Sequence, residues 1–293
     1  YAVPPKPETY GRTEEIVGSW FKARGNRDRI ILATKAVGPI PAPWIRGGKA
    51  RLDEKNIFEA VEGSLKRLQT DYIDLYQTHW PSRTVNKFGQ LGFVEPGDED
   101  FIHPGETLAV LGKLVAQGKV RHIGVSNESA WGVMTHLAEA ERQGLPRIVS
   151  IQNAYNLLNR SFEVGLSETA IREQVGLLAY APLAAGALSG KYLDGAVPPG
   201  TRRAVDGRKS RYDTPNADLA VKEYIAIATR HGLDPCQMAL AYVNSRPFLT
   251  SNIIGATSMT QLKTDIGSID LTLSEEVLAE IEETHHRYTI PCP

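Results

Sequence analysis

The feature that most constrains this chain is a regular alternation of short apolar runs with longer stretches of helical periodicity. Six runs rich in apolar residues are predicted strands, over residues 29–35, 72–80, 120–127, 147–155, 176–183 and 249–257. Each is followed by at least one segment of helical spacing; in residues 56–70 the spaced positions are Ile57, Val61, Leu65 and Leu68. Such alternation predicts a parallel sheet whose strands are joined by right-handed helical crossovers.

The other predicted helices fall between and after these strands. "PETYG" near the N-terminus predicts the start of one helix, and Ser274 is placed to cap the last one. The remaining helical patterns cover residues 106–119, 129–144, 161–174, 217–232, 234–246, 260–269 and 273–288. Neither a low-complexity linker nor a charged tail divides the sequence, so we predict a single domain over residues 1–293.

Composition excludes several other classes of protein. The 293 residues are 42% hydrophobic and 23% charged, which is enough apolar material for a sizeable core. A formal net charge of −1 gives no overall attraction to nucleic acid or to a membrane surface. Two cysteines, Cys236 and Cys292, lack the spacing of a zinc site and suit a reducing compartment. With no long apolar run and no signal sequence, we expect a cytoplasmic protein without a bound metal.

Two closures of the sheet are consistent with the alternation, an open doubly wound sheet and a barrel. An open nucleotide-binding sheet normally carries a glycine-rich turn after its first strand, and the sequence has neither that turn nor a Walker loop. Polar residues instead end nearly every predicted strand: Lys35, His79, Ser126, Asn127, Gln152, Asn153, Tyr180 and the segment 255–257. Polar ends on apolar strands are typical of the catalytic rim of a (β/α)8 barrel, although six strands are present rather than eight.

The order of these polar strand ends resembles the aldo-keto reductase superfamily. The resemblance runs over essentially the whole chain and is nearest to the Tas-type NADP(H)-dependent members, in "PPKPETYG", "SLKRLQTDYIDLYQTHWP", "LVAQGKVRHIGVSNE", "IVSIQNAYNLLNRSFE", "LLAYAPLAAGALSGKYL" and "GATSMTQLKT". It implies an α/β fold, the (β/α)8 TIM barrel, with the first two strands lacking in this chain. It also implies hydride transfer from NADPH to an aldehyde or ketone.

The same resemblance implies a catalytic set of aspartate, tyrosine, lysine and histidine. By position the lysine is Lys35, the histidine is His79 and the tyrosine that donates the proton is Tyr1, while the aspartate has no counterpart. Tyr10 is the alternative donor if the register differs. These groups suit carbonyl reduction, because a phenol and an imidazole can meet the charge that grows on the oxygen. A nearby ammonium lowers the pKa of the phenol.

NADPH/NADP⁺ is the implied cofactor, and its nicotinamide end has four implied contacts. Ser126, Asn127 and Gln152 resemble the family's carboxamide-binding residues, and hydroxyl and amide groups offer both donors and acceptors for a carboxamide. Tyr180 resembles the aromatic residue that stacks on the nicotinamide ring. Each of the four has a plainer explanation as a polar strand end, a helix cap or a core residue.

The phosphate end has two implied segments. The pyrophosphate-binding loop supplies Pro182, Leu183, Ala185 and Lys191, with Arg202 as a further cation, and the 2′-phosphate segment supplies Gly255, Thr257, Gln261 and Asp265. Many relatives have arginine where Gln261 stands, and Asp265 would repel a phosphate. A helix N-terminus and the Thr257 hydroxyl still suit an anion, so NADPH is expected over NADH in spite of these departures, with NADH left open.

A long connection over residues 81–105 follows His79, and long loops often close over active sites. We expect Trp80, Phe88 and Phe93 to shape the pocket for a small carbonyl substrate, with Trp44 as a further candidate; an ordered surface loop or a subunit contact are the alternatives. Some proteins of this superfamily are cofactor-binding regulatory subunits, which is the alternative function here. The sequence does not predict the oligomeric state.

Overall fold

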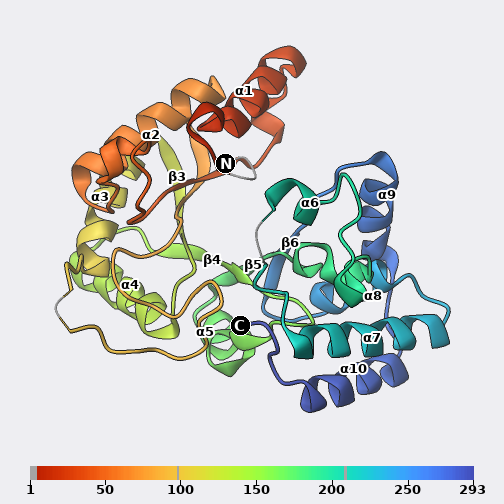
Figure 1. Cartoon of the computed structure of the whole chain (residues 1–293). Helices are drawn as coiled ribbons and strands as arrows, with labels where there is room; N and C mark the ends of the chain where they lie inside the picture. Colours follow the sequence, from red (N-terminus) through yellow and green to blue (C-terminus); the bar gives the residue numbers. More distant parts are fainter. Residues whose placement is uncertain (1–4, 98, 208–209) are drawn as a thin grey trace. The chain divides into compact units, whose positions relative to one another are not determined.

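The computed structural model describes residues 5–97, 99–207 and 210–293 (Figure 1). Tyr1, the expected proton donor, lies outside the described residues. The chain divides into two compact units. The N-terminal unit comprises the chain up to Val85 together with Val94–Ile151, and the C-terminal unit comprises Asn86–Phe93 and Gln152–Pro293.

Three parallel strands lie wholly within the N-terminal unit. They are β1 (Ala33–Ala36), β2 (Ile73–Thr78) and β3 (Val120–Ser126). The register places Lys35 beside Gln77 and Gln77 beside Gly124. Side chains alternate along a strand, so Lys35, Gln77 and the following His79 lie on the same face of the sheet.

Helices α1 (Arg12–Arg24), α2 (Glu54–Leu68), α3 (Pro104–Ala116) and α4 (Ala130–Gln143) cover the other face of these strands (Figure 1). Helix α2 begins where the Asp53 carboxylate accepts the Asn56 N–H at 2.9 Å, a standard N-terminal cap. Its apolar positions Ile57, Val61 and Leu68 are buried, as the periodicity predicts.

The N-terminal end of this sheet is fixed by the buried carboxylate of Asp74. It forms an ion pair with Arg27 at 2.8 Å and accepts the Leu32 N–H at 3.0 Å, while its other oxygen accepts from Arg121 at 2.7 Å. Residues Arg27–Arg29 form a 3₁₀ turn and the Leu32 N–H is bonded to Asp74, so β1 begins at Ala33 and not at residue 29 as predicted.

Strand β4 (Ile148–Ala154) crosses the boundary between the units, and β5 (Gly176–Tyr180) and β6 (Leu249–Ile253) belong to the C-terminal unit. Strands β5 and β6 are parallel, and the six strands follow one another in sequence order through the sheet. The predicted parallel α/β class is therefore confirmed, with six strands among the described residues.

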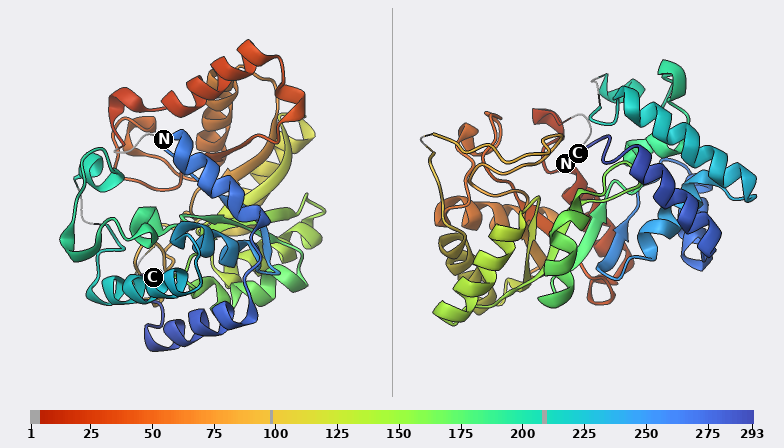
Figure 2. Two further views of the ribbon diagram at one scale, coloured as in Figure 1. Left: turned by 90° about the vertical axis from the view of Figure 1, so that its right-hand side faces the viewer. Right: turned by 90° about the horizontal axis from the view of Figure 1, so that it is seen from below.

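The helices of the C-terminal unit are α5 (Leu166–Arg172), α6 (Arg202–Asp206), α7 (Pro215–Arg230), α8 (Pro235–Asn244), α9 (Met259–Gly267) and α10 (Glu275–Arg287). Helices α7 and α10 pack side by side (Figure 2). The predicted helix over residues 161–174 is broken at Gly165 into a 3₁₀ turn, Ser161–Val164, and α5. Helix α6 was not predicted, because its five residues are too short to show a period.

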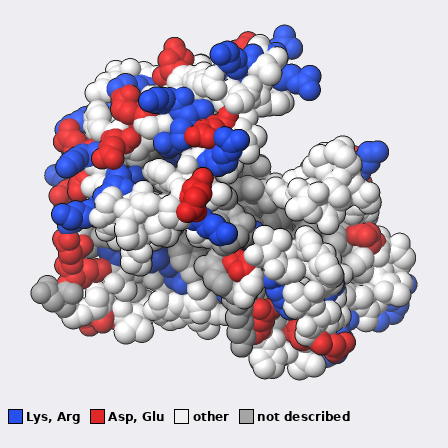
Figure 3. All heavy atoms as spheres, turned by 45° about the horizontal axis from the view of Figure 1, so that its top comes forward, with Lys and Arg blue, Asp and Glu red and all other residues white. Residues whose placement is uncertain are grey.

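The described surface matches the nearly balanced charge of the chain. Basic and acidic side chains are interspersed over the face drawn in Figure 3. Among the described residues, no helix combines the length and the apolar character needed to cross a bilayer. Cys236 and Cys292 are both free thiols.

Candidate active site

Lys35 and His79 lie at the C-terminal ends of neighbouring strands of the N-terminal unit. Lys35 is the penultimate residue of the short strand β1, and His79 directly follows β2. The His79 N–H donates to the Ala36 carbonyl at 2.8 Å, which continues the β1–β2 pairing past the end of β2. The structure therefore brings together two of the three predicted catalytic residues.

Both groups are poorly solvated, and both have lowered pKa values. Burial lowers the pKa of Lys35 to about 8. Burial also lowers the pKa of His79 to about 3, with the positive charge of Lys35 as a further cause. At neutral pH the site thus pairs an ammonium with a neutral imidazole, which keeps one N–H donor and one acceptor nitrogen.

Ser126 and Asn127 lie at the end of β3, next to the end of β2, and both are buried. The Asn127 side chain donates to the His79 carbonyl oxygen at 2.8 Å and to the Ser126 hydroxyl at 3.2 Å. Asn127 has φ 52°, a left-handed conformation that asparagine tolerates better than most residues. These contacts tie the predicted carboxamide-binding pair to the backbone of the predicted catalytic histidine.

Trp80 is held firmly beside His79. Its indole N–H donates to the Pro39 carbonyl at 2.9 Å, and its ring centroid lies 4.5 Å from that of His79. Gly38 packs against it so closely that an added Cβ would lie 2.5 Å from the Trp80 carbonyl oxygen. A fixed aromatic ring next to the imidazole is consistent with the expected role at a substrate pocket, which stays a prediction.

Within the C-terminal unit, the predicted nicotinamide contacts lie at the ends of two strands. Gln152 is near the end of β4 and Tyr180 is the last residue of β5. The Arg211 guanidinium lies 5.6 Å from the centre of the Tyr180 ring and 5.0 Å from that of Tyr212. Sequence reasoning did not select Arg211, because its position in a loop carries no periodic signal.

The predicted pyrophosphate loop follows β5. Pro182 is buried, and Leu183, Ala185 and Lys191 are partly buried. Ala185 has φ 55° and the adjacent Gly186 has φ 96°, so the backbone makes an unusual left-handed turn here.

The cations near this loop differ in their surroundings. The Lys191 ammonium lies 5.3 Å from the centre of the Tyr192 ring, and Arg202 is exposed. The neighbouring Arg203 forms an ion pair with Asp213 and stacks 4.1 Å from the Tyr192 ring centre. Lys191 and Arg202 are the two cations predicted to bind phosphate. Among the described residues, neither forms an ion pair of the kind that Arg203 makes with Asp213.

The predicted 2′-phosphate segment divides into exposed and buried parts. Gly255, Thr257 and Gln261 are exposed at the start of α9, and Thr257 donates to the Gln261 side-chain oxygen through its N–H at 2.9 Å. Asp265 is instead buried on the inner side of α9, and burial followed by the charge of Asp234 raises its pKa. Asp265 therefore does not share the solvent-exposed surface on which Gly255, Thr257 and Gln261 lie.

Phe88 and Phe93, the other expected substrate contacts, are 49% and 63% exposed. Trp44 in the N-terminal unit is 39% exposed. Their contribution to a pocket stays a prediction.

Sequence reasoning also missed a buried ion pair next to the site. The Arg83 and Glu128 side chains are 7% and 2% exposed and are joined by two hydrogen bonds. Arg83 comes four residues after His79, and Glu128 directly follows Asn127. Its only sequence signal was the glutamate that ends "GVSNE", which does not identify a partner.

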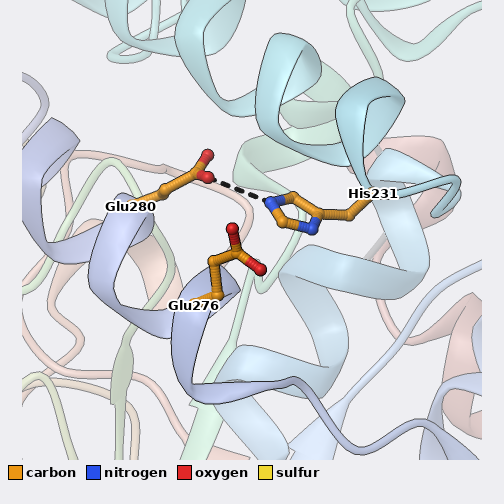
Figure 4. A group of neighbouring side chains, drawn as sticks. All are labelled: His231, Glu276 and Glu280. Atoms are coloured by element: carbon orange, nitrogen blue, oxygen red, sulfur yellow. Dashed lines mark hydrogen bonds and ion pairs between the residues drawn. The ribbon is translucent and has the colours of Figure 1, made fainter.

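A second titratable group lies between α7 and α10 (Figure 4). The ligand atoms of His231, Glu276 and Glu280 lie within 4.8 Å of one another, and the His231 Nε2 is 3.0 Å from Glu280. Arg230 pairs with the same Glu280 carboxylate, and this contact followed by the hydrogen bond from His231 lowers the pKa of Glu280. Because Glu280 already has a cationic partner and Glu276 is exposed, we interpret the group as ion pairs between two surface helices.

Comparison with known proteins agrees with this arrangement. The Aldo/keto reductase family profile matches residues 7–286. The chain is 53% identical over 295 residues to Protein tas of Escherichia coli (strain K12), covering 100% of this chain and 85% of that protein. It is 30% identical over 293 residues to L-glyceraldehyde 3-phosphate reductase of the same strain, covering 97% of this chain and 77% of that protein. It is 29% identical over 280 residues to a probable voltage-gated potassium channel subunit beta of Arabidopsis thaliana, covering 93% of this chain and 79% of that protein. The chain belongs to the aldo-keto reductase family, and it is an oxidoreductase of the kind that acts on carbonyl groups.

Proposed function

We propose that the protein reduces the carbonyl group of an aldehyde or ketone to an alcohol, with NADPH as the hydride donor. The observation that supports this most is the pairing of Lys35 and His79 at adjacent strand ends. One is an ammonium whose pKa burial lowers to about 8, and the other is an imidazole that stays neutral at physiological pH. A named carbonyl reductase among the relatives, L-glyceraldehyde 3-phosphate reductase, supports the same reaction class.

The proposed chemistry divides between cofactor and protein. NADPH, when bound, supplies the hydride that adds to the carbonyl carbon. Negative charge then grows on the carbonyl oxygen, and a His79 N–H hydrogen bond stabilises it there. The Tyr1 phenol gives that oxygen its proton, and the Lys35 charge favours the phenolate that results. The role of Tyr1 rests on its position in the sequence.

The chemistry of the donor groups fits a nicotinamide dinucleotide. The Ser126 hydroxyl and the Asn127 amide have the donors and acceptors that suit a carboxamide, and so does the Gln152 amide. Lys191 and Arg202 suit the diphosphate, and the exposed start of α9 with Thr257 and Gln261 suits the ribose phosphate. The preference for NADPH over NADH and a cytoplasmic location, which suits the two free thiols, are parts of this proposal.

The test is aldehyde-dependent oxidation of NADPH, followed by the loss of absorbance of the reduced nicotinamide. The protein should consume NADPH with one or more of a panel of small aldehydes and ketones, and it should consume NADH more slowly. Lys35→Met should lower turnover by at least about 100-fold while NADPH affinity stays within about threefold.

A second function is favoured by the likeness to the channel subunit beta. In that case the protein would bind NADPH as a regulatory subunit without metabolic turnover. Tight NADPH binding with no oxidation by any carbonyl of the panel would favour this second function over the first.

A further inference from the structure

The buried Arg83–Glu128 pair joins the two loops that carry the predicted site residues. The Arg83 Nη1 donates to one Glu128 oxygen at 3.0 Å, and Nη2 donates to the other. Nη2 also lies 3.3 Å from the Ser129 hydroxyl, and the Ser129 N–H donates to Glu128 at 2.7 Å. The guanidinium faces the Trp131 ring, 4.9 Å from its centre. This is a two-point ion pair with further hydrogen bonds to Ser129, a geometry in which a buried pair can hold two segments in one arrangement.

A second contact, between Asn127 and His79, joins the same two loops. Asn127 donates to the His79 carbonyl at 2.8 Å, and Arg83 and Glu128 lie a few residues further along each loop. The space around the pair is filled, since a Cβ on Gly132 would lie 2.1 Å from the Glu128 carboxylate and 2.4 Å from Arg83. Neither loop can shift without separating a buried charge pair in a packed site.

We propose that Arg83 and Glu128 are positioning residues, whose ion pair holds the β2–α3 loop against the β3–α4 loop so that His79 and Asn127 keep their relative placement. This deepens the proposed function and rests on it for the effect on turnover. The pair touches none of the reacting groups. It acts through the backbone of His79 and the side chain of Asn127, where a displacement of about 1 Å can cost about 100-fold in rate.

The chain offers a control pair at the N-terminal ends of β1 and β2. Arg27 and Asp74 also form a buried pair, at 2.8 Å with side chains 15% and 9% exposed, before β1 and at the start of β2. Arg27→Met removes one partner there and leaves Asp74 with Arg121. The test pair is removed by the double variant R83M/E128L, which leaves no unpaired charge behind, and it is broken by E128Q, which keeps the side-chain shape but leaves the Arg83 charge unpaired.

The experiment compares these variants by melting temperature, by steady-state kinetics and by hydrogen–deuterium exchange of the peptides around 79–85 and 126–132. In R83M/E128L we expect faster exchange in both peptides and a fall of about 10–100-fold in kcat, with the KM for NADPH changed by less than about threefold. E128Q leaves the Arg83 charge buried without its carboxylate, so its melting temperature should be no higher than that of R83M/E128L. Arg27→Met should lower the melting temperature without faster exchange in either peptide and with kcat unchanged within about twofold.

The proposal is overturned if either peptide of R83M/E128L exchanges at the rate seen in the unmodified protein. It is also overturned if Arg27→Met, at a melting temperature similar to that of R83M/E128L, shows the same exchange rates and the same kinetics as R83M/E128L. An unmodified protein that reduces no carbonyl would refute the proposed function. The exchange comparison would still decide on its own whether the pair holds the two loops together.

Discussion

Lys35 holds a charge in a poorly solvated position, and this has consequences of opposite sign for stability and for turnover. Burial disfavours the ammonium form and lowers its pKa from 10.5 to about 8. Below pH 8 the lysine is protonated in both folded and unfolded chains, so the free-energy cost of burying its charge lowers the stability of the folded protein in full. Between about pH 8 and 10.5 the unfolded chain binds the proton more strongly, so this contribution to stability improves as pH rises.

Lys35→Met should therefore raise the melting temperature at pH 7 while it lowers carbonyl reduction by at least about 100-fold. The methionine keeps the apolar stem and removes the poorly solvated charge. Lys49→Met, at an exposed lysine, is the control and should change neither quantity by much. Scanning calorimetry and initial rates check this, and a lower melting temperature together with unchanged rates would contradict it.

The pH profile follows from the same two groups. Because Lys35 loses its proton near pH 8, kcat/KM for reduction should fall as pH rises through about 8. His79 stays neutral down to about pH 3, so no limb near pH 6.5 is expected from it. A rate profile from pH 5 to about 9.5 measures both features. A limb near 6.5 that disappears in His79→Gln would show that the imidazole titrates, against this account.

At the scale of elements, close approach of backbones decides which substitutions are tolerated. Helix α1 docks on α2 at Gly18, where an added Cβ would lie 2.3 Å from the Arg67 carbonyl oxygen and 2.7 Å from the Leu68 backbone. The contact is with backbone atoms, which cannot rotate away. The two helices would have to separate to admit a side chain.

Gly18→Ala should thus destabilise the protein by about 3 kcal/mol, although alanine is the better helix former. Ser19→Ala is the neighbouring control, because the Ser19 hydroxyl bonds only the Glu15 carbonyl of its own helix and is exposed. Urea unfolding of both variants gives the comparison. Equal stability of Gly18→Ala and the unmodified protein would show that the helices do not pack this closely.

The inner face of β2, β3 and β4 in the N-terminal unit is similarly tight at Gly124. A Cβ there would lie 2.7 Å from the Ser150 hydroxyl and 3.1 Å from the Gln77 side chain. Gly124→Ala should cost about 1–3 kcal/mol, and G124A/S150A should recover part of that loss because the nearest atom is removed. If the double variant is less stable than the sum of the two single changes predicts, the clash lies elsewhere.

Much of the element level was predictable, since strand and helix periods reflect burial that the sequence states directly. The positions of Lys35, His79, Ser126 and Asn127 at strand ends followed from the same pattern. The late start of β1 was not predictable, because it depends on the Asp74 carboxylate, which is 42 residues away from Leu32 in the sequence. The Arg83–Glu128 pair was missed for the same reason: its partners are 45 residues apart and neither has a periodic signal.

At the scale of the whole molecule, the proposed function predicts that cofactor binding stabilises the folded chain. NADPH at about 100 times its Kd should add about 2.7 kcal/mol, which raises the melting temperature by roughly 5 °C. NADH at the same concentration should raise it less, because the exposed Thr257 and Gln261 would lack the ribose phosphate. Equal shifts with the two cofactors, measured by a thermal melt, would contradict the NADPH preference.

The central claim is that hydride passes from NADPH to a carbonyl carbon at the Lys35–His79 site. The most direct measurement supplies NADPH deuterated at its hydride-donating carbon, together with an aldehyde, and locates the label in the product by mass spectrometry and NMR. The account predicts deuterium on the carbinol carbon of the alcohol, formed at least about 100-fold more slowly by Lys35→Met. An unmodified protein that binds the labelled cofactor and leaves the aldehyde unlabelled, or a Lys35→Met variant that transfers the label at the full rate, would contradict it.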